Sequence, residues 1–169
     1  MKTLMGLPTS TAKSPWFVIA ILIAAVFAPA ASHNVASEDE KEDAGQRVID
    51  KITRDELIAL MKSEGYAVDV TDQGNIRWKI DGFRSVIYVA DDQHSMQFSV
   101  GFVDLEPSLE RINEWNRDMR FSSSYLDSEV DPNLKLDLDI AGGVTQDRIV
   151  GFLSSCRTAF ENWRQHIKK

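Results

Sequence analysis

The sequence predicts an α+β fold in which three helices cover one face of an antiparallel sheet. Apolar residues recur every three or four positions in three segments, and they alternate with polar residues in six shorter segments. Short turns join the first four alternating segments, as in an antiparallel meander. Because helices interrupt the strands, the order along the chain is one helix, four strands, one helix, two strands and one helix.

Each helix is predicted from its ends as well as from its apolar stripe. Thr53 and Glu56 have the spacing of a capping box, and Gly65 offers the left-handed residue that ends the first helix. Pro107 fits the first turn of the second helix, which we expect to end near Arg120. Thr145 can cap the third helix. The stripes are Leu57, Leu60 and Met61, then Leu109, Ile112, Asn116 and Met119, and finally Ile149, Leu153, Cys156, Phe160 and Trp163 with Phe152 beside them.

The strands are predicted from alternation, which also assigns their faces. One face is apolar throughout and the other carries small polar and charged residues, so the polar face is left for water, a second subunit or a partner. Residues 85–89 are apolar on both faces, which indicates a central or covered strand. Turns at 72–75 and 81–82 contain residue types that accept positive φ. The predicted strands are residues 66–71, 76–80, 84–90, 95–102, 125–129 and 134–140.

The first 30 residues differ from the rest of the 169-residue chain. They hold two lysines and no acid, and an uncharged apolar run at 16–27 is followed by small residues up to Ala30. This order predicts a secretory signal peptide cleaved after Ala30, and therefore a periplasmic or secreted protein. The apolar run is shorter than the roughly 20 residues that span a bilayer. The alternative is an uncleaved segment that anchors the chain in the inner membrane.

Residues 31–47 are predicted to form an acidic disordered linker. Five acids lie within residues 38–43 and almost no apolar residue accompanies them, so the segment cannot bury enough surface to order itself. A solvated spacer is favoured over an acidic interaction arm. The folded domain is then residues 48–169, enough for one core. The formal net charge of −7 argues against nucleic-acid binding, because an acidic chain repels phosphate.

The polar sheet face carries four candidate binding residues, Arg77, Lys79, Asp137 and Asp139. The two aspartates have the residue type of metal ligands or of an acid and base pair. Structural ion pairing is favoured, because hard cations need about six oxygens and no glycine-turned acidic loop lies beside these residues. Arg77 and Lys79 are candidate ion-pair partners across strands.

No catalytic constellation is found in the sequence, and no cofactor or metal is expected. Cys156 lies on the apolar stripe of the last helix, where a thiol behaves as a small hydrophobe. The spacing of His33, His94 and His166 does not match a zinc site. Gly142 and Gly143 precede a helix, but two glycines alone favour helix entry over an anion site.

A cluster of polar and aromatic residues lies in the second half of the second predicted helix and just after it. Asn116 shares the stripe of apolar residues, so its amide must find hydrogen-bond partners at the core or its rim. The favoured interpretation is that Asn116 ties the helix to the backbone of a neighbouring strand, with Trp115 packed beside it. The alternative is a ligand-reading cluster. The cluster comprises Asn113, Trp115, Asn116, Arg120 and Phe121.

These residues resemble a known family. Six segments are similar to the YbjN family of bacterial sensory transduction regulators. The most distinctive is Asn113-Glu114-Trp115-Asn116-Arg117-Asp118-Met119-Arg120-Phe121. The others are Tyr125-Leu126-Asp127, Leu136-Asp137-Leu138-Asp139, Gly142-Gly143-Val144, Gly65-Tyr66 and Trp78 to Phe83. The resemblance covers about residues 52–163. It implies a fold similar to type III secretion chaperones, which pair as dimers and bind extended segments, and it implies no established reaction. The signal segment departs from cytoplasmic members of the family.

Three functional hypotheses follow. The leading one is an exported, non-enzymatic protein-interaction module, homodimeric or chaperone-like, that holds an unidentified polypeptide. It would use a sheet face or edge and the surface around Arg117 and Arg120. The second is a sensor of a small ligand, with a pocket near Trp115 and Asn116. An enzyme ranks last, because no base, nucleophile or metal set assembles by spacing.

Overall fold

The computed structural model describes residues 46–168. The predicted signal peptide, its cleavage after Ala30 and residues 31–45 of the predicted linker lie outside the described residues. The elements are β1 (Val48–Ile49), α2 (Arg54–Ser63), β2 (Val68–Val70), β3 (Ile76–Ile80), β4 (Phe83–Val89), β5 (Ser95–Gly101), α3 (Leu109–Asp118), β6 (Ser123–Leu126), β7 (Pro132–Asp139), β8 (Val144–Thr145) and α4 (Gln146–His166).

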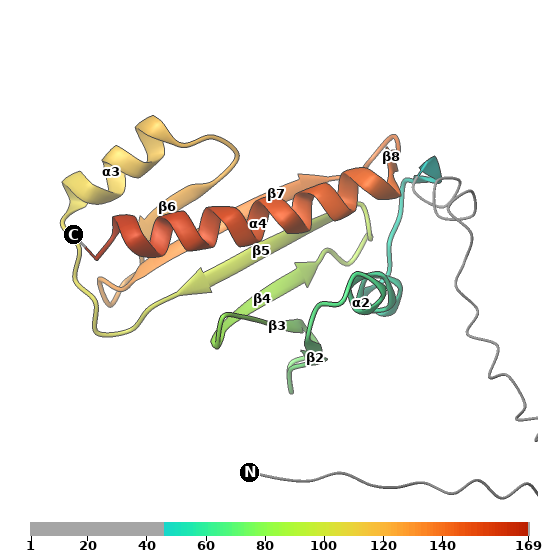
Figure 1. Cartoon of the computed structure of the whole chain (residues 1–169), viewed down its shortest axis with the longest axis horizontal. Helices are drawn as coiled ribbons and strands as arrows, with labels where there is room; N and C mark the ends of the chain where they lie inside the picture. Colours follow the sequence, from blue (N-terminus) through green and yellow to red (C-terminus); the bar gives the residue numbers. More distant parts are fainter. Residues whose placement is uncertain (1–45, 169) are drawn as a thin grey trace, which may run out of the picture. The chain divides into compact units, whose positions relative to one another are not determined.

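Six of the strands form one antiparallel sheet in the order β2-β3-β4-β5-β7-β6. The long helix α4 runs across this sheet in front of β5 and β7, and α3 lies beside β6 (Figure 1). The fold class is therefore α+β, as predicted. The described helices follow the predicted order, and β4 holds an interior position, as its two apolar faces indicated.

The predicted start and end of the first helix and the predicted start of the last helix are confirmed. Thr53 and Glu56 form the capping box: the Glu56 N–H donates to Thr53 Oγ1 over 3.2 Å, and the Thr53 N–H donates to Glu56 Oε2 over 2.8 Å. Gly65 has a φ of 82° and ends the first helix. The Thr145 hydroxyl accepts from the Arg148 N–H at the start of α4.

The prediction for the strand at 125–129 is wrong by two to three residues. Strand β6 ends at Leu126 because the Asp127 carboxylate accepts the N–H groups of Glu129 and Asp131, each over 3.0 Å, and folds the chain into a turn. Strand β2 is also shorter than predicted. The small sheet of β1 and β8 was not predicted, because two-residue strands leave no periodic signal.

The prediction for the buried face of the second helix is partly wrong. Leu109 is 67% exposed and Met119 41% exposed, whereas Ile112 and Trp115 are buried. Leu109 is the first residue of α3 and Met119 is its C-cap, so both exposed residues lie at the ends of the helix. The prediction that Pro107 lies in the first turn is also wrong, because Ser108 caps the helix and Pro107 precedes it.

The core lies between the sheet and the helices and contains three buried tryptophans, Trp78, Trp115 and Trp163. The predicted stripe of α4 is buried along its whole length, Cys156 included. The predicted domain boundary at residue 48 cuts through a contact, because the Arg47 carbonyl accepts from the Gln146 N–H over 2.9 Å. Within residues 46–168, no helix is long and apolar enough to cross a membrane.

Candidate binding surfaces

The helix α3 is fixed to the edge strand β6 by one side-chain amide. Asn116 Nδ2 donates to the Ser124 carbonyl over 2.8 Å, and the Ser124 N–H donates to Asn116 Oδ1 over 2.8 Å. The Asn116 side chain thus makes the two hydrogen bonds to Ser124 that a neighbouring strand would otherwise make. The predicted structural role of Asn116 is confirmed, and both of its polar atoms are engaged.

Three further hydrogen bonds fasten α3 and α4 around this strand. Trp115 Nε1 donates to Ser122 Oγ over 3.1 Å, and Trp163 Nε1 donates to Ser124 Oγ over 2.8 Å. His166 Nε2 lies 2.8 Å from the Arg111 carbonyl. Both indole N–H groups are satisfied although their rings are buried, as such groups require. Hydrogen bonds therefore hold α3 near both of its ends, at Arg111 and at Trp115 and Asn116.

A groove of about 280 Å³ opens beside this end of α3. Its floor includes the buried Trp115, and one wall is a row of small residues on α4. At its rim stand Met119 and Arg120, followed by Phe121, which is 85% exposed with a φ of 61°. We call Met119, Phe121 and this groove the Phe121 surface. The groove is lined by Trp115, Met119, Arg120, Ser122, Ser154, Ser155, Thr158, Ala159 and Asn162.

The remaining predicted residues of α3 are exposed. Arg117 Nε lies 2.9 Å from Asp118 Oδ1, and this hydrogen bond lowers the pKa of Asp118. Asn113 makes no hydrogen bond among the described residues. Arg120 therefore joins Trp115 at the groove, whereas Arg117 and Asn113 face solvent beside it.

The four predicted residues of the polar sheet face do not form one cluster. Arg77 and Lys79 lie on β3, and β4 and β5 separate them from Asp137 and Asp139 on β7. The proposed ion pairs between the two sets are therefore wrong: sequence does not reveal strand order, and the order here keeps them apart. Arg77 Nε instead meets Asp69 Oδ1 at 2.6 Å, which lowers the pKa of Asp69.

Asp137 and Asp139 have structural partners of their own. Asp137 Oδ1 accepts from Gln97 Nε2 over 2.6 Å, and Asp139 Oδ1 accepts from the Ala141 N–H over 2.8 Å. Within residues 46–168, no three His, Cys, Asp or Glu side chains gather as metal ligands. Burial raises the pKa of the Cys156 thiol, which holds it in its unreactive protonated form.

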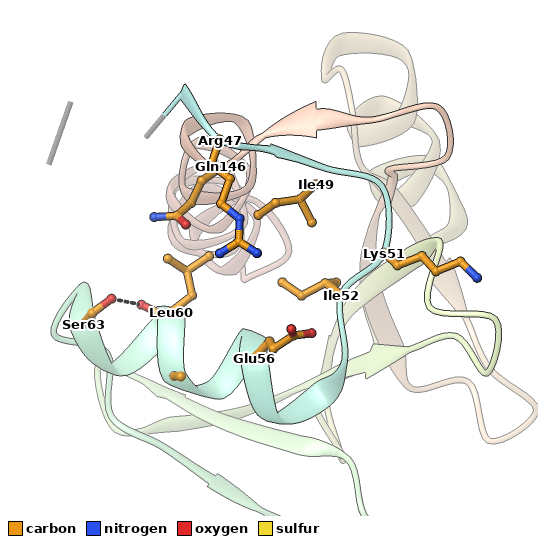
Figure 2. Close-up of a pocket in the computed structure, with 9 residues that line it drawn as sticks. Arg47, Ile49, Lys51, Ile52, Glu56, Leu60, Ser63 and Gln146 are labelled. Atoms are coloured by element: carbon orange, nitrogen blue, oxygen red, sulfur yellow. Dashed lines mark hydrogen bonds between the residues drawn. The ribbon is translucent and has the colours of Figure 1, made fainter. Parts of the chain in front are cut away.

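A second hollow, of about 340 Å³, lies between α2, β1 and the start of α4. Figure 2 shows the Arg47 side chain reaching into it toward Leu60, with Ile49 and Ile52 on the wall and Lys51 directed away. Sequence reasoning missed this hollow because Arg47 falls in the acidic segment that we predicted to be a linker. Its residues come from three elements that share no periodic pattern.

The fold and these surfaces define a small α+β protein with one covered and one open sheet face. Within residues 46–168, the candidate sites are grooves and not clusters of reactive groups. The chain belongs to the YbjN family, described as "Putative bacterial sensory transduction regulator", whose model matches residues 53–169. The family assignment made from residues 113–121 is thus confirmed.

Comparison with solved structures supports the fold. The chain is similar to the crystal structure of YbjN, described as "a putative transcription regulator from E. coli", with a TM-score of 0.54 and 16% sequence identity. The match covers 69% of this chain and 91% of that one. At this identity the likeness establishes the fold alone. No curated protein matches the chain.

Proposed function

We propose that the protein is an exported, non-enzymatic protein-interaction module of regulatory or chaperone-like kind that works as a homodimer. Membership of a family described as regulators supports a role in interaction rather than turnover. The leader of residues 1–30 supports export. The observation that carries the proposal is the conformation and exposure of Phe121.

An exposed aromatic residue with positive φ is costly in an isolated domain. A non-glycine residue held in the left-handed region costs about 1–3 kcal/mol, and burial of the Phe121 ring does not offset it because 85% of the residue is exposed. Met119, 41% exposed, stands two residues away. A surface that is costly to the monomer and rich in apolar area is typical of an interaction site.

The Phe121 surface carries both a projection and a hollow. A two-fold interface must be self-complementary, so each subunit has to offer the groove and the side chain that fills it. The Phe121 ring is the projecting group, and the groove floored by Trp115 is lined on α4 by small side chains such as Ser154 and Ala159. Arg117 and Arg120 would then lie at the polar rim of the interface.

Sedimentation equilibrium tests this proposal. We expect a dimer at micromolar concentration and a monomer for Phe121→Gly. Glycine adopts the same positive φ without strain, so this variant should fold at least as stably as the original chain. Val103→Gly is the matched control, because Val103 is 76% exposed and lies outside the groove. A monomeric wild-type protein, or equal dimerisation of the two variants, would contradict the proposal.

A second candidate, a small-ligand sensor, is favoured by the position of Trp115 on the groove floor. The Asn116 amide is occupied by Ser124 and so has no group left to bind a ligand. The polar side chains that line the groove are Arg120, Ser122, Ser154, Ser155, Thr158 and Asn162. Screening metabolites for thermal shifts and for a change in tryptophan fluorescence tests it, since a ligand of the native state raises the midpoint by mass action.

A further inference from the structure

The two edges of the six-stranded sheet differ in how their backbone groups are satisfied. At the β6 edge, Asn116 bonds both main-chain groups of Ser124, and α3 lies along the strand. Such covering of an edge prevents another chain from adding a strand there. The other edge is β2, which pairs with β3 alone.

The outward groups of β2 can be deduced from its register. Thr71 N–H donates to the Asn75 carbonyl, and Lys79 N–H donates to the Ala67 carbonyl, so the odd-numbered residues face β3. The N–H and C=O groups of Val68 and Val70 therefore point away from the sheet. No side chain of residues 46–168 bonds to them, and Val70 is 44% exposed.

Two cations lie side by side on the open face near this edge. Asp81 and Gly82, with φ values of 49° and 85°, make a two-residue hairpin turn that sets Lys79 opposite Arg84. The backbone N–H of Lys79 donates to Ala67, the residue before β2, and therefore points away from Arg84 on β4. Lys79 and Arg84 thus form a non-hydrogen-bonded pair, the kind in which opposing side chains approach most closely. Like charges placed this way destabilise a sheet. Neither residue has an ion pair among residues 46–168.

We infer that β2 receives an extended acidic polypeptide as an additional strand, with a carboxylate of that segment bound by Lys79 and attracted by the neighbouring charge of Arg84. Only a polypeptide offers backbone groups that match those of Val68 and Val70. The register continues to Ala67, whose small side chain lies between the incoming strand and Lys79. Strands are about 4.8 Å apart, so a glutamate opposite Ala67 and the long Lys79 side chain can meet across it.

A second copy of the chain fits this edge poorly. The register that uses all four outward groups of Val68 and Val70 would set Asp69 directly against the partner subunit's Asp69, and like charges in that position repel. A register shifted to avoid this contact pairs Val68 alone. The matching segment therefore alternates apolar residues with polar ones and has its acid opposite Ala67, not opposite Asp69.

This inference rests on the proposed function in taking a polypeptide as partner, and direct peptide binding tests it. The probe is a short blocked peptide in which valine alternates with threonine around one central glutamate. Binding is followed by the amide signals of Val68 and Val70 in NMR titration. We expect those signals to shift, affinity to fall about three- to tenfold when glutamine replaces the glutamate, and binding to be lost when the valine nitrogens are methylated.

Protein variants locate the site. Lys79→Gln with Arg84→Gln should reproduce the loss seen with the glutamine peptide, whereas Lys135→Gln, on the same face but on β7, should leave affinity unchanged. Equal binding by the methylated peptide or by the double variant would overturn the inference. The Phe121→Gly protein separates the two proposals: unchanged peptide binding in a monomer leaves the β2 site standing, and a dimer without peptide binding refutes only that site.

Discussion

Asn116 and Ser124 are joined by two hydrogen bonds of 2.8 Å each, so that a side-chain amide substitutes for a strand at the edge of the sheet. The same contact fixes the end of α3 from which Phe121 projects. Asn116 therefore contributes both to protection of the sheet edge and, with the Trp115 and Trp163 hydrogen bonds, to presentation of the Phe121 surface.

Replacing Asn116 should destabilise the fold. Asn116→Ala leaves the partly buried N–H and C=O of Ser124 without their partners, and we expect a loss of about 1–3 kcal/mol in the free energy of unfolding. Urea denaturation measures it. Asn113→Ala is the matched control on the same helix and should stay within about 0.5 kcal/mol of the original chain. Equal midpoints for the two variants would contradict the role assigned to Asn116.

The capping box should make stability depend on pH. The backbone hydrogen bond from Thr53, followed by its hydroxyl, lowers the pKa of Glu56 from the ordinary value of 4.5. A lowered folded-state pKa contributes stability above the unfolded-state pKa, which is lost as the pH falls through the folded value. We therefore compare the denaturation midpoint at neutral pH with that at pH values below 4.5. On this acidification the midpoint should fall less for Glu56→Gln than for the original chain. Parallel acid profiles would refute this.

Cys156 should be inert in the folded protein. It is fully buried, and burial raises the pKa of its thiol. We expect no alkylation by iodoacetamide at neutral pH until denaturant is added, followed by complete reaction. If Cys156 in the folded protein were alkylated as fast as a free thiol, its burial in α4 would be contradicted.

Export should leave a shorter chain. If residues 1–30 are a signal peptide, the mass of the protein from the cell envelope corresponds to a chain that begins at Ala31. A mature form that still carries Met1 would instead support an amino-terminal anchor.

Local chemistry made much of the fold predictable. The Thr53 cap, the Gly65 terminator and the α4 stripe follow from spacing within one element, and all three are confirmed. The pairing of Lys79 with Arg84 could also have been read from the sequence, because a two-residue turn at 81–82 fixes the register of its hairpin.

Contacts between distant strands were not predictable in the same way. The separation of Arg77 from Asp137 depends on strand order, which alternation does not encode. The exposure of Leu109 and Met119 depends on where α3 meets its neighbours, and a stripe of apolar residues does not contain that information. The groove at Trp115 likewise joins α3 to α4 across about 40 positions of sequence.

The central claim is that the Phe121 surface binds another polypeptide, and photo-crosslinking in the native envelope tests it most directly. A photoreactive amino acid in place of Phe121 should yield covalent adducts of the chain with a second copy of itself on irradiation, and adducts with other polypeptides alone would contradict the proposed dimer. The same residue in place of Val103 should yield few. Absence of adducts from position 121, or equal yields from both positions, would contradict the account.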